Sequence, residues 1–250
     1  MFLQWHSVGP ESRAALSFYA TLWRMGKRQE SRDRIEAQII ELGRRHLVTE
    51  GAGGLSLRAI ARELGMVSSA VYRYVASRDE LLTLLLIDAY TELAESVVSA
   101  QGAAGGSWRD QVAAIAHAAR AWAVGAPASW ALLYGSPVPG YQAPRDQTVG
   151  PGTRVVAALF DAVGSGVAEG QVVGRDDVVA PALSGDFDGL REEFDFGGDD
   201  AVVARCVTLW AGLIGAISLE VFGQYGPDTL TDPGALFDLQ IALLIDLVAS

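Results

Sequence analysis

The sequence predicts an all-α fold, and three observations support this prediction. Apolar residues recur at helical spacing along most of the 250 residues. Alternation of apolar and polar residues between turn signals, the pattern of a strand, is almost absent. Helix boundaries are also marked, since S-x-x-E at 77–80 is a capping box and GAGG at 51–54 is typical of a helix end. Half of the residues are hydrophobic, which is enough for a sizeable core.

Cysteine usage and hydropathy indicate a cytoplasmic protein. The single cysteine, Cys206, excludes an internal disulfide framework and lies in an apolar run, which suits a reducing compartment. The apolar stretch at 14–23 lacks the positive flank of a signal peptide. The longest apolar run, 206–219, has only 14 residues and is too short to cross a bilayer. We therefore expect no membrane segment.

Charge is divided unevenly along the chain, whose formal net charge is -11. Residues 24–78 hold 11 Lys and Arg against six acidic residues, whereas residues 101–250 hold seven against 18. The N-terminal part is therefore mildly basic and the C-terminal part strongly acidic. An anionic partner is expected to meet the N-terminal part.

Four helices are predicted in the N-terminal part. The first runs from about residue 31 to 48 and is followed by the GAGG end. Two short helices lie within LRAIARELGMVSSAVYRYVASRDEL (57–81). A fourth begins at Ser77, the first residue of the capping box, and runs to about residue 98. The Gly-rich QGAAGGS (101–107) separates this helix from the rest of the chain.

The C-terminal part is predicted to be helical with one long loop. The expected helices cover about 108–125, 127–134, 151–170, 201–224 and 234–249. Residues 174–200 are rich in Gly and Asp, which predicts a mobile acidic loop. Asp186, Asp188 and Gly189 within it do not keep the ligand spacing of a calcium-binding EF-hand, so no metal site is expected.

The spacing of Ala61, Gly65 and Val71 predicts a helix-turn-helix. Two short helices that cross closely need a small residue at the contact, a glycine where the turn takes positive φ, and a branched apolar residue on the second helix. Ile60 and Leu64 complete the expected core. The second helix of such a pair fits the major groove of DNA, which is about 12 Å wide.

Polar residues around this motif are suited to DNA contacts. Ser56 is the expected N-cap of the first helix of the pair. Base contacts are expected at the start of the second helix, from Ser68, Ser69 and Ala70, with Arg58 or Arg73. Phosphate contacts are expected from Tyr72, Arg73, Tyr74 and Arg78, and from an N-terminal arm of Lys27, Arg28, Arg32 and Arg34. Helix pairs with a glycine turn also occur in proteins that never meet DNA, but the arginine and tyrosine cluster favours the DNA-binding interpretation.

Residues 31–98, with SLRAIARELG, VYRYVASRDEL and the long helix after them, resemble the DNA-binding domain of the TetR family of bacterial transcription regulators. The resemblance implies a homodimer on a palindromic operator, with a C-terminal domain that binds a small molecule and thereby changes the spacing of the two DNA-binding domains. One departure is Val67, where the family often has a small polar residue, so Ser68 is expected to cap the recognition helix. The chain accordingly divides into an N-terminal extension (1–24), a helix-turn-helix domain (25–77) and a helical effector-binding and dimerisation domain (78–250).

Two C-terminal segments resemble a regulatory domain that some TetR-type proteins carry. They are WALLYGSPVPGYQAP (130–144) and LWAGLIGAISLE (209–220). That domain is named for its tryptophan and His-Gly motif, and here Ile214 stands before Gly215 where the histidine is usual. No ligand or packing role of that histidine is therefore transferred to this chain.

Small residues along the helix predicted at 201–224 favour a close contact with another helix. With the helix at 151–170, it is expected to form a four-helix dimer interface, although an internal core helix is the alternative. The interface residues are expected to be Leu159, Val163, Ala211, Gly215, Ser218 and Phe222.

Aromatic residues in the C-terminal part predict a pocket for a small hydrophobic effector. The candidate lining residues are Trp108, His117, Trp122, Trp130, Tyr134 and Phe160. Aromatic residues at helical spacing are also common in plain cores, so each of them has that alternative.

Together these features predict a sequence-specific DNA-binding transcription regulator, a repressor that a small hydrophobic ligand releases from a palindromic operator. A dimeric DNA-binding protein without an effector is one alternative. A helical enzyme is another, but His6, His46 and His117 have no metal-ligand spacing and no nucleophile motif is present. No cofactor is expected.

Overall fold

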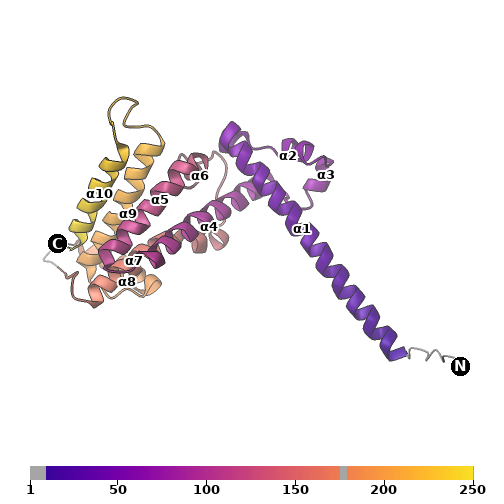
Figure 1. Cartoon of the computed structure of the whole chain (residues 1–250), viewed down its shortest axis with the longest axis horizontal. Coiled ribbons are helices and arrows are strands. Elements are labelled where there is room, and N and C mark those ends of the chain that lie inside the picture. The colour runs from indigo at the N-terminus through magenta and orange to yellow at the C-terminus, as the bar shows by residue number, and fades with distance from the viewer. Residues whose placement is uncertain (1–9, 175–178, 250) are drawn as a thin grey trace, which may run out of the picture. The chain divides into compact units, whose positions relative to one another are not determined.

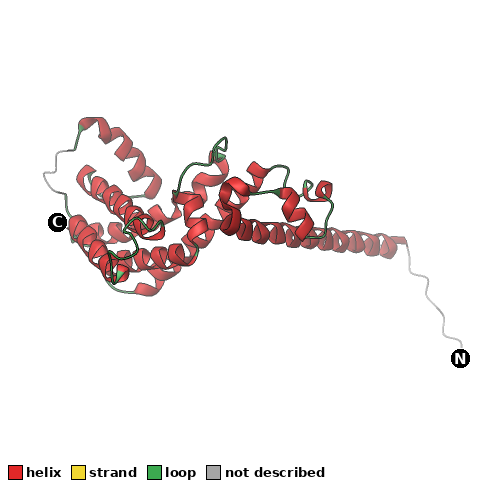
Figure 2. Ribbon diagram, turned by 90° about the horizontal axis from the view of Figure 1, so that it is seen from above, coloured by secondary structure: helices red, strands yellow, loops and turns green. Residues whose placement is uncertain are grey.

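The computed structural model describes the backbone of residues 10–174 and 179–249, and the side chains of residues 29–174 and 179–249. Over these ranges the chain consists of helices and loops without a strand (Figures 1 and 2), which confirms the predicted all-α fold. The helices are α1 (Pro10–Gly54), α2 (Leu57–Glu63), α3 (Ser68–Val71), α4 (Arg78–Ala104), α5 (Trp108–Gly125), α6 (Pro127–Tyr134), α7 (Arg145–Ala168), the short 3-10 helix η1 (Pro181–Leu183), α8 (Ser184–Phe194), α9 (Asp200–Val221) and α10 (Pro233–Ala249).

The chain divides into two compact units. The head comprises Met1–Glu50 and Gly54–Leu81, and the body comprises Gly51–Gly53 and Leu82–Ser250. Near the predicted GAGG end, Gly51 leaves the helical conformation with φ 67° and kinks α1.

The head contains the predicted helix-turn-helix. Ser56 caps α2, because its Oγ accepts a hydrogen bond from the backbone N–H of Ala59 at 3.4 Å. Gly65 in the turn has φ 66°, a conformation that costs side-chain-bearing residues energy. Ala61 and Val71 are fully buried where α2 and α3 cross. The two short helices therefore pack against each other as one unit.

The long helix α4 begins after Ser77, as predicted. The Oγ of Ser77 accepts a hydrogen bond from the backbone N–H of Glu80 at 3.0 Å, and the Glu80 carboxylate accepts one from the N–H of Ala76 at 2.5 Å. The helix continues through the first residues of QGAAGGS to Ala104, so only three residues separate it from α5. Ser107 and Asp110 then form a full capping box at the start of α5, and the hydrogen bonds from Ser107 lower the pKa of Asp110.

The prediction of a loop at 174–200 is wrong, because η1 and α8 lie within it. Phe187 is buried, and Leu190 and Phe194 pack against the same core from the next turns of α8. The ring of Phe160 on α7 lies 4.8 Å from that of Phe194. The helical spacing of these apolar residues outweighs the many Gly and Asp residues around them.

Two further boundaries differ from the prediction. Helix α1 begins at Pro10 rather than near residue 31. Helix α7 begins at Arg145 rather than near 151, and Pro151 lies inside it. Pro151 is the seventh residue of the helix and so lies beyond the first turn, which means that α7 lacks the hydrogen bond that an N–H at this position would donate to the carbonyl of Gln147.

Helix α9 is the one helix in the described part of the chain that is long and apolar enough to cross a membrane, with a mean hydropathy of 1.8. The core helix of a globular protein meets the same criterion, and α9 packs against α5, α6, α7, α8 and α10. Cys206 on α9 is buried, and desolvation raises the pKa of its thiol to about 12. The thiol is therefore protonated at neutral pH and suited to packing rather than to chemistry.

Helices α5 and α7 pack closely at Gly166. An alanine Cβ at this position would lie 2.6 Å from Cδ1 and 2.7 Å from Cγ of the Trp108 ring. Because Trp108 is enclosed by the core, its ring has little freedom to retreat. We expect Gly166→Ala to destabilise the body by about 1–3 kcal/mol.

Gly164 in the same helix provides a matched control. The nearest atom to a Cβ there is 3.6 Å away, on Phe196, so Gly164→Ala should be neutral or stabilising by up to about 1 kcal/mol. Urea unfolding of both variants, followed by circular dichroism, measures the difference. Equal midpoints for the two variants would contradict the close contact at Gly166.

Candidate nucleic-acid interface

The recognition helix α3 has no side-chain cap. Its N-cap residue is Val67, which is extended (φ -69°, ψ 141°) and carries no hydrogen-bond acceptor. Ser68 is already the first helical residue, so the prediction that Ser68 caps the helix is wrong. A side chain caps a helix from the extended position just outside it.

Helix α3 presents one face to solvent. Ser69, Tyr72 and Arg73 are exposed, and Tyr72 retains 44% of its accessible surface. Their spacing places them on one side of the helix and its C-cap turn, opposite the buried Val71. Ser68, Ala70 and Tyr74 are half-buried at the edges of this face. The predicted base-contact and phosphate-contact residues therefore lie side by side.

The arginines of the head differ in whether they have a carboxylate or aromatic partner. Arg58 and Arg73 are exposed and have no ion pair with any described residue. Arg32 bonds Glu36 at 2.7 Å, and its guanidinium lies 5.7 Å from the centre of the Tyr74 ring. Arg78 lies 3.8 Å from Asp79 at the start of α4. The predicted contacts of Lys27 and Arg28 fall on side chains outside the described residues.

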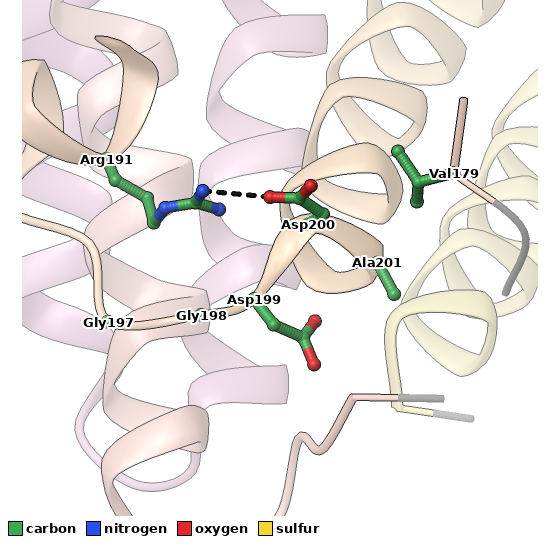
Figure 3. A pocket seen from close by; sticks show the side chains of 7 residues that line it. All are labelled: Val179, Arg191, Gly197, Gly198, Asp199, Asp200 and Ala201. Carbon is green, nitrogen blue, oxygen red and sulfur yellow. Dashed lines mark ion pairs between the residues drawn. The ribbon is translucent and has the colours of Figure 1, made fainter. Parts of the chain in front are cut away.

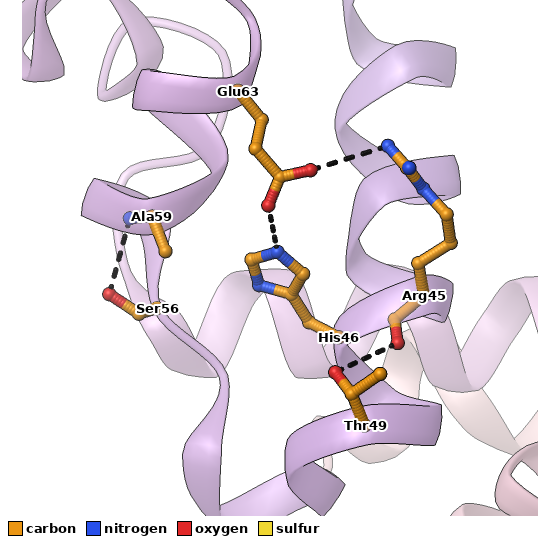
Figure 4. A network of polar contacts seen from close by, with 6 residues as sticks. All are labelled: Arg45, His46, Thr49, Ser56, Ala59 and Glu63. Carbon is orange, nitrogen blue, oxygen red and sulfur yellow. Dashed lines mark hydrogen bonds and ion pairs between the residues drawn. The ribbon is translucent and has the colours of Figure 1, made fainter.

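A polar network that sequence reasoning missed joins α1 to α2 (Figure 4). The Glu63 carboxylate lies 2.5 Å from Nε2 of His46 and 3.4 Å from Nη2 of Arg45. The hydrogen bond with His46 is the main cause of the lowered pKa of Glu63, followed by the charges of His46, Arg45 and Arg62. The partners are 17 and 18 residues apart in sequence. No local pattern signals such a pair.

The six predicted effector contacts in the body do not gather in one place. Trp122, Trp130 and Tyr134 form a chain of rings, with centroids 6.5 Å and 4.4 Å apart. Tyr90 extends it, 6.5 Å from Tyr134. Burial and the nearby Tyr90 raise the pKa of Tyr134. The indole N–H of Trp130 donates to Oγ of Ser218 on α9 at 3.2 Å.

The other three predicted contacts lie elsewhere in the body. Trp108 is buried against Gly166, and Phe160 is buried against Phe194. His117 is exposed on α5, with Nδ1 3.7 Å from a carboxylate oxygen of Asp238. Trp108 and Phe160 are thus part of the hydrophobic core, whereas His117 is exposed to solvent.

An acidic recess of about 520 Å³ lies at the start of α9 (Figure 3). The Asp200 carboxylate there bonds Arg191 at 2.8 Å and Ser184 at 2.7 Å, and the hydrogen bonds from Ser184 and Arg191 lower its pKa. Asp199 caps α9 by accepting from the N–H of Val202. Each carboxylate thus has a structural partner. No group of His, Cys, Asp and Glu suited to a metal ion occurs within the described ranges.

Comparison with known proteins identifies the family. The profile of bacterial regulatory proteins of the tetR family matches residues 39–85, and that of the tetracyclin repressor-like C-terminal domain matches residues 112–244. The HTH-type transcriptional regulators Rv1816 of Mycobacterium tuberculosis and Mb1846 of Mycobacterium bovis are each 62% identical over 227 residues, which cover 90% of this chain and 97% of theirs. The chain belongs to the TetR family.

Solved structures agree with this assignment to the TetR family. The crystal structure of a regulatory protein designated SCO4313 has a TM-score of 0.72 and 33% sequence identity, over 87% of this chain and 98% of that one. The TetR family regulator PfmR from Thermus thermophilus, at 14% identity, shares the fold with a TM-score of 0.54, over 84% of this chain and 97% of that one. This TetR-family chain is a DNA-binding helix-turn-helix transcription regulator and not an enzyme.

Helices α9 and α10 of this TetR-family protein carry several of its exposed apolar residues. Ala211 and Gly215 are exposed on α9, together with Val207, Leu219 and Phe222. Three leucines, Leu239, Leu243 and Leu247, are exposed at four-residue spacing on α10. We call these eight residues the apolar face.

Three of the predicted interface residues lie outside this face. Leu159 and Val163 on α7 are only 1% and 0% exposed, because the body's own core encloses them. They are thus unavailable to a second copy, and their assignment to the interface is wrong. Ser218 directs its hydroxyl to Trp130. The leucines of α10 were not predicted as interface residues, although their four-residue spacing places them on one face of a helix.

Proposed function

We propose that the protein is a repressor that binds a palindromic operator as a homodimer and is released by a small hydrophobic ligand. The observation that carries the DNA-binding part is the solvent-facing set on α3 and its C-cap turn. Ser69, Tyr72 and Arg73 are exposed there, and Arg73 has no ion pair with a described residue. Ser68, Ser69 and Ala70, with Arg58, are the proposed base readers. Tyr72, Arg73, Tyr74 and Arg78 are the proposed phosphate contacts.

The homodimer is proposed to form through the apolar face. Eight exposed apolar or small side chains on two adjacent helices are a large patch for a surface in water, and a second copy would cover them symmetrically. Dimerisation also serves DNA binding. Residues 24–78 hold only five more basic than acidic residues, and two heads double the number of phosphate contacts.

The effector is proposed to bind at the ring chain of Trp122, Trp130 and Tyr134. These rings offer an apolar lining with few polar groups, which favours a hydrophobic ligand. The Trp130–Ser218 hydrogen bond ties this chain to α9, part of the proposed dimer interface. A ligand that displaces Trp130 would thereby disturb α9.

Binding to DNA from immediately upstream of the protein's own gene tests the proposal. We expect the full chain to bind this DNA as two copies and to prefer it to a random duplex, as measured by fluorescence anisotropy and light scattering at several salt concentrations. A hydrophobic effector should quench tryptophan fluorescence and release the DNA. In a reporter strain, deletion of the gene should raise expression from the bound promoter. Equal, weak binding to both DNAs would contradict an operator at this position, and lower expression would contradict the repressor assignment.

A further inference from the structure

Val67 is an exposed apolar residue at the start of the recognition helix α3. It retains 71% of its accessible surface, and as the N-cap residue it makes no side-chain hydrogen bond to the helix. A serine or aspartate at this position would accept a hydrogen bond from a helical N–H and stabilise the helix. Valine forgoes that stabilisation and exposes a branched hydrocarbon side chain to water.

The position of Val67 distinguishes it from Val48 of α1, which retains 73% of its accessible surface. Single exposed apolar residues are ordinary on a protein surface, so exposure alone assigns no role to either valine. In a helix-turn-helix, however, the N-terminal residues of the second helix meet the base edges. Val67 directly precedes the three proposed base readers at 68–70, whose short side chains allow the start of α3 to approach the bases closely. Val67 therefore lies in the stretch that would enter the major groove.

The side chains of this stretch offer a limited set of hydrogen-bonding groups. The sequence at 66–71 is MVSSAV, which contains no charged residue and no asparagine or glutamine. Those absent side chains make the direct hydrogen bonds by which proteins identify guanine, adenine and cytosine. A serine hydroxyl both donates and accepts, so it distinguishes the bases poorly. Apolar contact is the remaining means of base recognition, and the C5-methyl group of thymine is the apolar group that the major groove displays.

We propose that Val67 is a specificity-determining residue, which packs against the C5-methyl group of a thymine in each half of the operator. The inference rests on the operator binding and base reading proposed above. The χ1 angle of valine is stiff, so its two methyl groups lose little conformational freedom on binding. Contact removes the valine methyl groups and the thymine methyl group from water together. This gain is specific to thymine, because no other standard base of DNA carries that group.

Replacement of thymine by uracil in the DNA tests the contact, because the two bases pair identically and differ only in the methyl group. The full chain first selects its preferred duplexes from a pool with a randomised central segment, so the probe does not depend on where the operator lies in the genome. Each thymine of a selected duplex is then replaced by uracil, symmetrically in both halves. At one position per half, wild type should lose affinity about fourfold for each methyl group, and therefore roughly 15-fold for the symmetric pair, as measured by fluorescence anisotropy.

Variants of Val67 separate the methyl contact from effects on the DNA or on the fold. Val67→Ala should bind the thymine and uracil duplexes with nearly equal affinity, since the partner of the methyl group is lost. Val67→Ser should behave in the same way although its hydroxyl restores a cap to α3, so a weakened helix would not account for the loss. Val48→Ala is the matched control, because Val48 is as exposed as Val67 but belongs to α1, and it should keep the full preference for thymine.

The outcomes distinguish this inference from the proposed function. A thymine preference that disappears only in the two Val67 variants would support the contact. An equal penalty for uracil in wild type and in Val67→Ala, or no penalty at any position in wild type, would overturn the role of Val67 and leave operator binding intact. A pool from which wild type enriches no sequence would instead contradict the proposed operator binding, and with it any base contact of Val67.

Discussion

Replacing Leu243 by glutamate is expected to convert the proposed dimer to a monomer and to weaken operator binding by at least roughly a hundredfold. Leu243 is 61% exposed in the single chain and lies in the middle of the α10 leucine row. In a two-fold dimer each substitution occurs twice, so two apolar side chains are lost and two unpaired carboxylates are placed in the interface. Each lone head would then hold only half of the operator contacts.

Light scattering of the purified full chain and anisotropy on operator DNA measure this effect. Val124→Glu is the matched control, because Val124 is an exposed apolar residue of α5 outside the apolar face. The control should remain dimeric and bind DNA normally. A dimeric Leu243→Glu protein would show that the copies associate through another surface.

The sequence predicted the head better than the body because local chemistry marks the elements of the head. Ser56 and Ser77 are caps recognisable from their neighbours, and the glycine of the turn is required by a positive φ. The cap of α3 is the exception among these helix starts. Val67 stands where a polar cap is usual, and only the backbone conformation shows that the helix begins uncapped.

The helices predicted or proposed to form the dimer interface show what the periodicity of apolar residues cannot decide. Leu159 and Val163 on α7 have the same helical spacing as the exposed leucines of α10, so both helices offer an apolar stripe. Which stripe is enclosed by the chain's own core depends on how α5, α7 and α9 pack in three dimensions. That arrangement involves residues far apart in sequence.

Side-chain pairs across the fold were beyond prediction for a similar reason. The sequence marks His46 only as a histidine without metal-ligand spacing and gives no signal for Glu63, yet the two side chains meet between α1 and α2. In the segment 174–200, the many Gly and Asp residues led to the prediction of a loop. The helical spacing of Phe187, Leu190 and Phe194 instead gives α8 an apolar face, which packs against the core and against Phe160 of α7.

The double variant Tyr72→Phe with Arg78→Ala is expected to weaken binding to operator and random DNA alike, by about a hundredfold for the dimer. Tyr72 is exposed at the C-cap of α3, and Arg78 is the first residue of α4. A phenol hydroxyl and a guanidinium at that junction are suited to phosphate oxygens, which carry no sequence information. Their loss should therefore lower affinity without changing the preference for the operator.

Salt dependence distinguishes this role from a loss of folding or of base contacts. Each lost charge contact removes about 0.9 from the slope of log affinity against log salt, so a dimer that lacks Arg78 on both heads should have a slope smaller by about two. Arg62→Ala, an exposed arginine of α2 outside the proposed phosphate set, should leave the slope unchanged. An unaltered slope in the double variant would show that Arg78 meets no phosphate. A changed preference between operator and random DNA would place these side chains at the bases, because only base contacts and DNA shape distinguish one sequence from another.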